Sequence, residues 1–427
     1  MSDTHKTIEA VWKVESTRLI AAIARVTYDI GTAEELAQDA LVSALELWPR
    51  DGIPTNPAAW LMTAAKRRAI DHLRHHRMAE LKHPEITREL EYQQQQLGQA
   101  MERALDDALA QVIDDDILRL IFTACHPVLP TEGRIALTLR VACGLTTAEI
   151  ARAFLVPEKT LGQRIFRAKK ALAEARVPFE TPRGNDLRQR LESVLSVVYL
   201  IFNEGYTATS GDEWMRSSLC LYALRLGRML AQLLPAEPEV HGLLALMELQ
   251  SSRTAARRGP TGEAILLSDQ DRSLWDHAQI QRGLAALHQS QQLGGASQPY
   301  ALQAAIAACH AQANTAAETD WNRIVRLYDA LLQLNPSPIV ALNRAVAVGM
   351  AHGPAAGLHA LDAIAPTTAL ANYHLLPSVR ADLLTKLGRN EEAREELQRA
   401  LTMTDNQREH ELLEARLKLI SIDNRRG

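Results

Sequence analysis

Aromatic residues and helix-breaking residues are both scarce in this sequence. Phenylalanine, tryptophan and tyrosine make up 4% of its 427 residues, and it has 21 glycines and 18 prolines. β-Sandwiches and barrels place aromatic and β-branched residues in their strands and join those strands by Gly- or Pro-rich turns. Their scarcity, together with long stretches of alanine, leucine, arginine and glutamate, predicts an all-α protein.

Cysteine pairs and metal-binding motifs are also lacking. The four cysteines (Cys125, Cys143, Cys220 and Cys309) are far apart and lie in apolar helical segments. Without a C-x-x-C or Cys/His metal spacing, we expect reduced and buried cysteines, no metal and no cofactor. A nucleophile elbow, a phosphate-binding loop and a dinucleotide fingerprint are absent too, which argues against an enzyme.

Long hydrophobic runs do not occur either. No apolar run reaches 18 residues, and the first residues are polar and include an acid. A transmembrane helix and a secretory leader are therefore not expected. We expect a cytoplasmic protein with no membrane partner.

Charge is nearly balanced overall but unevenly distributed. The formal net charge of −4 excludes a chain that is basic over its whole surface. Residues 66–77 carry five basic side chains and one acid, and residues 158–176 carry six and two. Residues 80–116 between them carry ten acids and three bases. Two basic helices therefore flank an acidic connector, and such a connector is typical of a solvated linker.

The first basic segment follows a helix-start signal. Asn56 is a good N-cap, and Pro57 suits the first helical position. Apolar residues then recur every four positions on one face, while Arg67 and Arg74 fall on the opposite face. The pattern predicts an amphipathic helix with a basic face.

An earlier pair of helices precedes this segment. One is predicted to begin at Thr32, with Glu35 completing a capping box and apolar residues through Leu45 facing inward. Another amphipathic segment covers about residues 7–26. Taken alone, the three helices are also compatible with a small bundle whose basic face is merely solvated.

The second basic segment has the pattern of a helix-turn-helix. Thr146 and Glu149 form a capping box that opens a short helix, and residues 155–157 interrupt it. A longer helix is predicted from Glu158 to about Ala173, with polar and arginine residues on one face near its N-terminal end. In a helix-turn-helix this second helix reads base edges in the major groove. An ordinary helical hairpin with a charged face is the alternative.

Three segments occur in a fixed order along the first part of the chain: AEELAQDALVSALELWP, NPAAWLMTAAKRRAIDHLRHHR and LTTAEIARAFLVPEKTLGQRIFRAKKAL. Together they resemble a bacterial extracytoplasmic-function sigma factor of RNA polymerase. The resemblance covers about residues 1–180. It implies that the first segment docks on the polymerase, the second opens and reads the −10 promoter element, and the third reads the −35 element.

The resemblance assigns roles to particular residues. It implies that the partner is core polymerase, bound at its β′ clamp helices and its β flap. Gln38, Asp39 and Leu41 lie on the helix that resembles the one docking on the β′ clamp helices. It implies contact with the −10 side of promoter DNA by Trp60, Lys66, Arg67, Arg68, Arg74 and Arg77. It implies contact with the −35 side by Lys159, Thr160, Gln163, Arg164, Arg167 and Lys170. The family usually has glycine where this chain has Leu155, because the turn there often needs a positive φ. Leucine therefore either adopts that conformation at a cost or makes a slightly different turn.

The resemblance also divides the chain into parts. We expect region 2 over residues 1–79, an acidic linker over 80–112, region 4 over 113–176, a helical extension of unknown role over 186–290, and tetratricopeptide-like repeats over 291–427. Within the extension, residues 253–262 are expected to form a basic loop.

The last part of the chain has an internal period. Gly353 and Gly388 each separate two helical segments and lie 35 residues apart, close to the 34-residue tetratricopeptide repeat. Stacked helix pairs form a concave surface, which predicts a protein partner for this region. A helical array that only packs on the sigma domains is the alternative. The arrangement resembles a sigma-factor subgroup whose extension is thought to replace a separate anti-sigma factor in regulation.

Two functions from different classes remain for the whole chain. One is a promoter-specificity subunit of RNA polymerase with a regulatory extension. The other is a polymerase-independent helix-turn-helix regulator with a sensory repeat domain. The first basic bundle favours the polymerase subunit, because a simple regulator needs no polymerase-docking helix beside a strand-opening helix.

Overall fold

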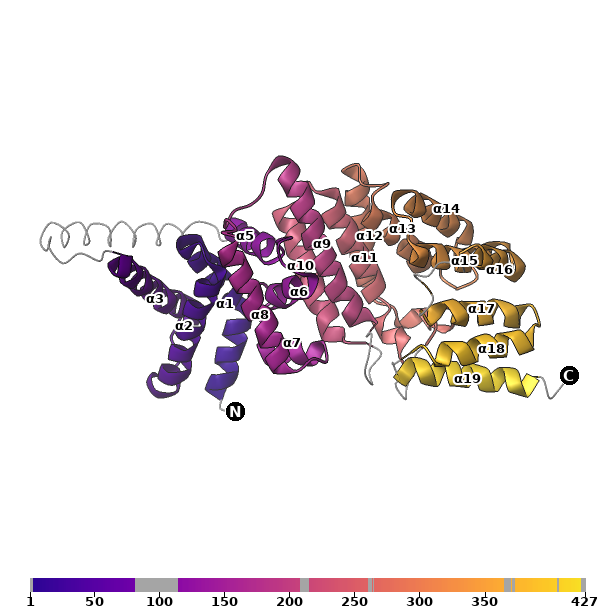
Figure 1. The fold of residues 1–427 in the computed structure, drawn as a ribbon, viewed down its shortest axis with the longest axis horizontal. Coiled ribbons are helices and arrows are strands. Elements are labelled where there is room, and N and C mark those ends of the chain that lie inside the picture. The colour runs from indigo at the N-terminus through magenta and orange to yellow at the C-terminus, as the bar shows by residue number, and fades with distance from the viewer. Residues whose placement is uncertain are drawn as a thin grey trace, which may run out of the picture. The chain divides into compact units, whose positions relative to one another are not determined.

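The computed structural model describes residues 3–80, 114–207, 215–259, 263, 265–364, 370, 373–404 and 407–423. Every regular element in these ranges is an α-helix or a short 3-10 helix, so the all-α prediction is confirmed (Figure 1). The chain forms two compact units, residues 1–200 and 201–427. None of the described helices combines the length and apolar character needed to cross a bilayer.

Unit 1 opens with three helices, α1 (Asp3–Thr27), α2 (Ile30–Asp51) and α3 (Pro57–Glu80), which pack on one another. α1 is buried on all sides from Leu19 to Ala24, because it packs on α2 and α3 and also on α5 (Asp114–Ala124) and α6 (Thr131–Val141). Small alanines on α2 and α3, such as Ala40, are completely buried, which allows the helix axes to approach closely. The predicted acidic connector, residues 80–112, lies outside the described residues beyond its first position.

The start of α3 is as predicted, and the start of α2 is not. The side chain of Asn56 accepts a hydrogen bond from the Ala59 amide at 3.1 Å, so it caps α3. α2, however, is capped by Asp29, whose carboxylate accepts from the amide of Thr32. The predicted start at Thr32 was therefore wrong by two residues, because an aspartate just upstream accepts the same kind of bond.

The helix-turn-helix region follows as α5 (Asp114–Ala124), α6 (Thr131–Val141), α7 (Thr147–Ala153) and α8 (Glu158–Glu174). α8 packs on both α6 and α7. α9 (Gly184–Tyr206) comes next along the chain, and its first half belongs to unit 1. The apolar residues predicted to anchor α8 are all buried: Leu161, Ile165, Ala168 and Leu172.

The turn of this motif confirms the predicted capping box and decides between the two alternatives for Leu155. Thr146 and Glu149 form the predicted capping box, with the Glu149 amide 3.1 Å from the threonine hydroxyl. Leu155 has φ 51°, the left-handed conformation expected at a position where glycine is usual. The cost of a leucine in this conformation is offset by the packing of α7 and α8, each of which buries one side. The departure from glycine thus leaves the motif's turn intact.

Unit 2 consists of helices joined by short connections. Its elements are α10 (Ser217–Leu233), α11 (Pro238–Ser251), η1 (Thr254–Arg257), η2 (Leu267–Asp269), η3 (Arg272–Leu274), α12 (His277–Gln292), α13 (Pro299–Gln312), α14 (Trp321–Leu334), α15 (Pro338–His352), α16 (Pro354–Asp362), α17 (Leu375–Lys386), α18 (Asn390–Leu401) and α19 (Gln407–Asp423). The predicted basic loop over 253–262 is wrong in part, since it contains the 3-10 helix η1 and a buried Arg257.

The C-terminal helices stack in sequence order. Each of α14 to α18 packs on the next helix along the chain. Gly353 ends α15 with φ 95°, and Gly388 follows α17 with φ 74°, so both predicted glycines make the turn inside a helix pair. Neighbour-to-neighbour packing is the arrangement of helical repeat proteins. The tetratricopeptide character of these pairs stays a prediction.

Candidate nucleic-acid interface

α8 presents the polar face that the sequence predicts. Gln163 and Arg167 are exposed, and Arg164 is partly exposed, while the opposite side of the helix is buried. Each buried leucine or isoleucine stabilises this docking by about 1.5–3 kcal/mol. The helix is therefore fixed to the domain by one side and offers the other to solvent.

The charged groups on this face differ in how they are occupied. Within the described residues, neither Arg164 nor Arg167 forms an ion pair or hydrogen bond through its side chain. Lys170 lies 3.6 Å from Glu174, and both side chains are well exposed, so this pair is weak. Lys159 and Thr160, at the N-terminal end, complete the predicted set. Free guanidinium groups beside a polar amide form a face that can read guanine and adenine edges.

One residue of this face was missed. Phe166 is 67% exposed on α8, although its ring is large and apolar. It lies one position before Arg167 and one turn after Gln163, which was the available signal in the sequence. An exposed phenylalanine on a reading helix can contact a thymine methyl group.

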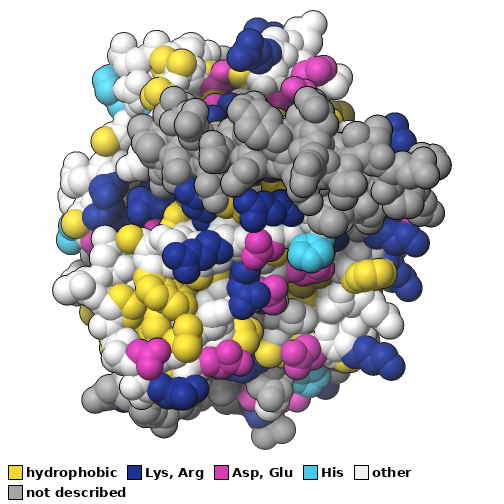
Figure 2. All heavy atoms as spheres, turned by 90° about the vertical axis from the view of Figure 1, so that its left-hand side faces the viewer, with side chains coloured by type: hydrophobic (Ala, Val, Ile, Leu, Met, Phe, Trp, Pro, Cys, Tyr) yellow, Lys and Arg dark blue, Asp and Glu magenta, His cyan; other side chains and the backbone are white. Residues whose placement is uncertain are grey.

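α3 carries the predicted −10 residues. Arg67 and Arg74 are exposed, and Lys66 is partly buried. Figure 2 views the chain from the side where Figure 1 places α2 and α3, and Lys and Arg side chains form a band across that face. The Trp60 ring packs edge-on against Trp48 at 5.4 Å, so much of it belongs to the core of the bundle. The side chain of Arg77 lies outside the described part of the structure.

Arg68 connects the two predicted binding surfaces of the bundle. Its guanidinium donates to the hydroxyl of Ser43 at 2.7 Å and lies 3.5 Å from the Asp39 carboxylate on α2. Arg68 is thus held by α2, unlike its exposed neighbour Arg67. It can orient Asp39 as well as contact DNA.

The predicted polymerase residues occupy different environments on α2. Asp39 is exposed, whereas Gln38 is partly buried and donates to the carboxylate of Glu34. Leu41 is partly buried against the cluster around Ile8 and Trp48. The three residues therefore do not form one exposed surface.

Exposed apolar side chains beside Asp39 were missed. Val42 is 49% exposed and Leu45 is 37% exposed, so the prediction that Leu45 faces inward was wrong. Both lie within two turns of Asp39 on α2, which gives this helix an apolar stripe with a charge at its edge. Such a stripe is typical of a helix that binds another protein.

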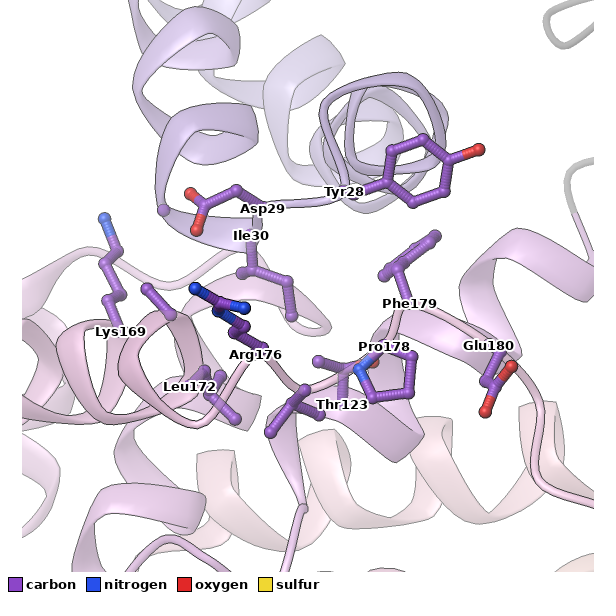
Figure 3. Close-up of a pocket in the computed structure, with 13 residues that line it drawn as sticks. Tyr28, Asp29, Ile30, Thr123, Lys169, Leu172, Arg176, Pro178, Phe179 and Glu180 are labelled. Carbon is purple, nitrogen blue, oxygen red and sulfur yellow. The ribbon is translucent and has the colours of Figure 1, made fainter.

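A pocket of about 420 Å³ lies between the turn joining α1 to α2 and the end of α8. Figure 3 shows Tyr28 and Asp29 on one side of it, with Leu172 and Arg176 on the other. The packing between the first three helices and the helix-turn-helix region is therefore incomplete at this point.

Metal and thiol chemistry have little support at these surfaces. Across the described ranges, no three His, Cys, Asp or Glu side chains lie close enough together to hold a metal ion. All four cysteines are buried and none forms a disulfide, as predicted. Burial raises the pKa of the Cys125 thiol to about 11 and that of Cys220 to about 12, which keeps both protonated and unreactive.

Family models match three parts of the chain. Residues 14–78 match sigma-70 region 2, and residues 119–172 match sigma-70 region 4. Residues 190–291 match a family of unknown function (DUF6596). The two sigma matches cover α2 with α3 and the helix-turn-helix, the surfaces described above.

Relatives among known proteins fall into two groups. An uncharacterized protein of Rhizobium meliloti is 42% identical over 388 residues, which cover 91% of this chain and 89% of that protein. A probable RNA polymerase sigma-C factor of Mycobacterium bovis is 29% identical over 144 residues, covering 34% of this chain and 70% of the relative. The ECF RNA polymerase sigma factor SigK of Mycobacterium ulcerans is 29% identical over 160 residues, covering 36% and 78%. No solved structure matches the chain.

Proposed function

The chain belongs to the sigma-70 family, as an RNA polymerase sigma factor of the extracytoplasmic-function type with a helical extension, and we propose that α8 reads the −35 element of its promoters while α3 reads the −10 element. It is a non-enzymatic initiation factor whose partners are core RNA polymerase and promoter DNA. The polymerase-independent regulator is not favoured, because region 2 is present as well as region 4.

The observation that carries this proposal is the exposed face of α8. Gln163, Arg164 and Arg167 lie on one side of a helix whose other side is buried, and the two arginines are free of partners among the described residues. Bidentate arginine contacts to guanine are the commonest specific contacts in the major groove. Lys159, Thr160 and Lys170 flank the face and suit phosphate contacts that position the helix.

α3 is assigned to the −10 element, and its residues contribute in two different ways. Arg67 and Arg74 are exposed and reach DNA directly, together with Lys66 and Arg77. Arg68 and Trp60 are partly held within the bundle, so they stabilise the surface as well as contact DNA.

Two surfaces of the protein are assigned to polymerase binding. α2 binds the β′ clamp helices through Asp39 and the apolar side chains of Val42 and Leu45, with Gln38 and Leu41 positioned beneath them. The helix-turn-helix region binds the β flap. Since polymerase and DNA are its partners, the protein acts in the cytoplasm.

The extension is assigned a regulatory role. Its helices α15–α18 each pack on the next one along the chain, and arrays of this kind bind proteins or peptides. We assign residues 291–427 to a protein partner that controls the sigma domains.

The polymerase surface is tested by charge reversal. Asp39→Arg should weaken binding to core polymerase at least ~10-fold, because it replaces a carboxylate by a cation beside Arg68. Asp51→Arg, an exposed acid at the end of the same helix, is the matched control and should bind core normally. Pull-down with purified core measures both, and circular dichroism checks that helix content is unchanged. Equal binding by Asp39→Arg and wild type would remove α2 as the docking helix.

A further inference from the structure

A second pocket lies inside unit 2, at the end of α13. It has a volume of about 200 Å³ and is lined by η3, by the start of α12 and by the residues at the end of α13. At ~30 Å³ for each water of the liquid, this space is worth about six water molecules. It suits a small ion rather than a segment of another protein. Two side chains of its lining, Arg272 and Trp275, carry donors that the protein does not use.

Trp275 supplies a buried donor to this pocket. The residue is only 4% exposed, and no acceptor among the described residues lies within hydrogen-bond reach of its indole Nε1. Buried tryptophan N–H groups usually have a partner, because an unpaired donor loses its hydration without gaining a bond in return. An acceptor atom that enters the pocket would supply the missing bond.

Arg272 uses only part of its guanidinium within the protein. Nη1 donates to the carbonyls of both His310 and Ala313, so both of its hydrogens are occupied. Nη2 has a long contact of 3.4 Å with the hydroxyl of Thr319, and Nε has no partner in the described part of the chain. Nε and Nη2 form one side of the guanidinium fork, and such a side binds a carboxylate or phosphate through two parallel bonds. Arg272 therefore keeps an oxyanion-binding edge while it holds the end of α13.

Two cations lie over the ring of Trp275. The guanidinium carbon of Arg272 is 4.8 Å from the centre of the ring, and that of Arg253 is 5.8 Å from it. Across the described ranges, neither arginine forms an ion pair. Burial lowers the pKa of His310, and the charges of these two arginines lower it further, to about 4. An anion in the pocket would thus be attracted by two positive charges.

The acids of this region are engaged with other groups. Glu318 attracts Arg272, but its carboxylate accepts a hydrogen bond from the Asn314 amide at 3.2 Å. The carboxylates of Asp271 and Asp276 accept from backbone amides at the start of η3 and of α12. These acids weaken the attraction for an anion, yet none of them forms a hydrogen bond with Arg272.

We propose that this pocket binds a small organic oxyanion, a carboxylate or a phosphate, between the Nε–Nη2 edge of Arg272 and the indole N–H of Trp275. The site lies in unit 2, on residues other than those assigned to DNA and polymerase. Because Arg272 also bonds the last carbonyls of α13, the bound anion stabilises the junction of η3 with that helix. The proposal concerns binding by unit 2 and does not depend on the assignment of α3 and α8 to promoter elements.

The indole N–H signal of Trp275 tests the site directly. Isotope labelling of tryptophan in the full chain gives one nuclear magnetic resonance signal for each indole, and Trp275→Phe identifies that of Trp275 by its loss. Sodium acetate, sodium succinate and inorganic phosphate are titrated separately, with chloride keeping the ionic strength constant. At least one of them should move the Trp275 signal until it saturates, with a dissociation constant of about 1 mM or tighter. Trp48 is the matched control, because its indole N–H is also buried without an acceptor but lies in unit 1.

Two substitutions test the roles of the two donors. Trp275→Phe keeps a ring beneath the arginines and removes the N–H, whereas Arg272→Lys keeps the charge and removes the fork. In calorimetric titrations with the anion that moves the signal most, each variant should bind at least ~10-fold more weakly than wild type. Arg282→Lys, an exposed change on α12 outside the pocket, should bind as wild type does. Circular dichroism checks folding, and Trp275→Phe decides alone if Arg272→Lys does not fold.

The outcomes identify the ligand class or remove the site. A response to phosphate alone assigns a phosphate ligand, and a response to acetate or succinate alone assigns a carboxylate. A Trp275 signal that none of the three ions moves overturns the proposal, as does equal movement of the Trp48 signal. Unchanged affinity in Trp275→Phe overturns it too. No polymerase or promoter enters these measurements, so failure of the proposed function would leave their result unchanged.

Discussion

Two arginine-rich regions of this molecule look alike in sequence and differ in structure. On α8, Arg164 and Arg167 face solvent and have no partner among the described residues. Between α11 and α12, Arg257 is 5% exposed, donates to the carbonyl of Tyr206 at 2.6 Å and stacks on the Tyr206 ring at 3.6 Å. Arg272 donates to the carbonyls of His310 and Ala313 at the end of α13. Arginine density alone does not identify a nucleic-acid surface.

The difference lies in what each guanidinium satisfies. The last carbonyls of a helix lack intrahelical partners and carry partial negative charge, so a cation placed there stabilises the helix end. Arg257 and Arg272 serve the ends of α9 and α13 in this way. Burial lowers the pKa of Arg257, yet it remains charged because its ordinary value is so high. The arginines of α8 have no such internal task, which leaves them available to DNA.

The largest expected effect is on stability. Arg257→Ala should lower the free energy of unfolding by about 3–4 kcal/mol, because it leaves a buried carbonyl unsatisfied and removes a cation–π contact. Arg167→Ala should change it by less than about 0.5 kcal/mol, since that side chain is exposed. Denaturant unfolding of the full chain measures both. Equal stability of the two variants would remove the distinction between these regions.

His310, whose carbonyl accepts from Arg272, makes the stability of this region depend on pH. Burial, and then the charges of Arg253 and Arg272, lower its pKa to about 4 from an ordinary 6.5. The unfolded chain therefore binds a proton at higher pH than the folded chain, so stability falls as pH drops from about 6.5 to 4. The loss from this group approaches ~3 kcal/mol. His310→Gln should flatten this slope in unfolding curves, and an unchanged slope would show that other groups cause it.

Substitutions on the exposed face of α8 should change DNA binding and leave stability nearly unchanged. Arg164→Ala should reduce discrimination between specific and random DNA by about 1–3 kcal/mol. Lys170→Ala should weaken binding to all sequences and lower the slope of affinity against salt by about one unit. Titrations at several salt concentrations separate the two patterns. Equal weakening of both DNAs by Arg164→Ala would assign that residue to phosphate rather than to bases.

The smallest expected effect concerns Gly162, in the second turn of α8. A Cβ atom there would meet nothing within 4 Å, so the protein itself does not require glycine. Gly162→Ala should raise the free energy of unfolding by about 0.5–1 kcal/mol. If DNA comes close to this backbone, the same variant should bind promoter DNA more weakly while being more stable. A destabilised variant would contradict the open surroundings of Gly162.

Local features of the fold could be predicted from the sequence. The caps at Asn56 and Thr146 and the buried side of α8 all follow from rules that involve neighbouring residues. The start of α2 was wrong because Asp29 and Thr32 are both good caps, and only the backbone decides between them. Interactions between neighbouring residues were sufficient to predict a helix cap where only one good capping residue was present.

Long-range partners could not be predicted. Nothing near Arg257 in the sequence shows that it lies against Tyr206, 51 residues earlier. The exposed side chains of Leu45 and Phe166 were missed because the helical pattern alone assigns apolar residues to the core. The contact between α9 and the helix-turn-helix region could not be predicted either: Arg190 and Ser193 on α9 hydrogen-bond to carbonyls of α5 and the residue after it. A truncation that isolates the sigma domains should therefore keep residues through about 200.

Promoter-directed transcription tests the central claim most directly. Purified full-length protein is mixed with core RNA polymerase and a template on which core alone does not start. The account predicts a defined start site that depends on the protein and is lost when Arg164→Ala is combined with Asp39→Arg. A start site that is unaffected by both substitutions, or no protein-dependent start on any template drawn from its own genome, would contradict it.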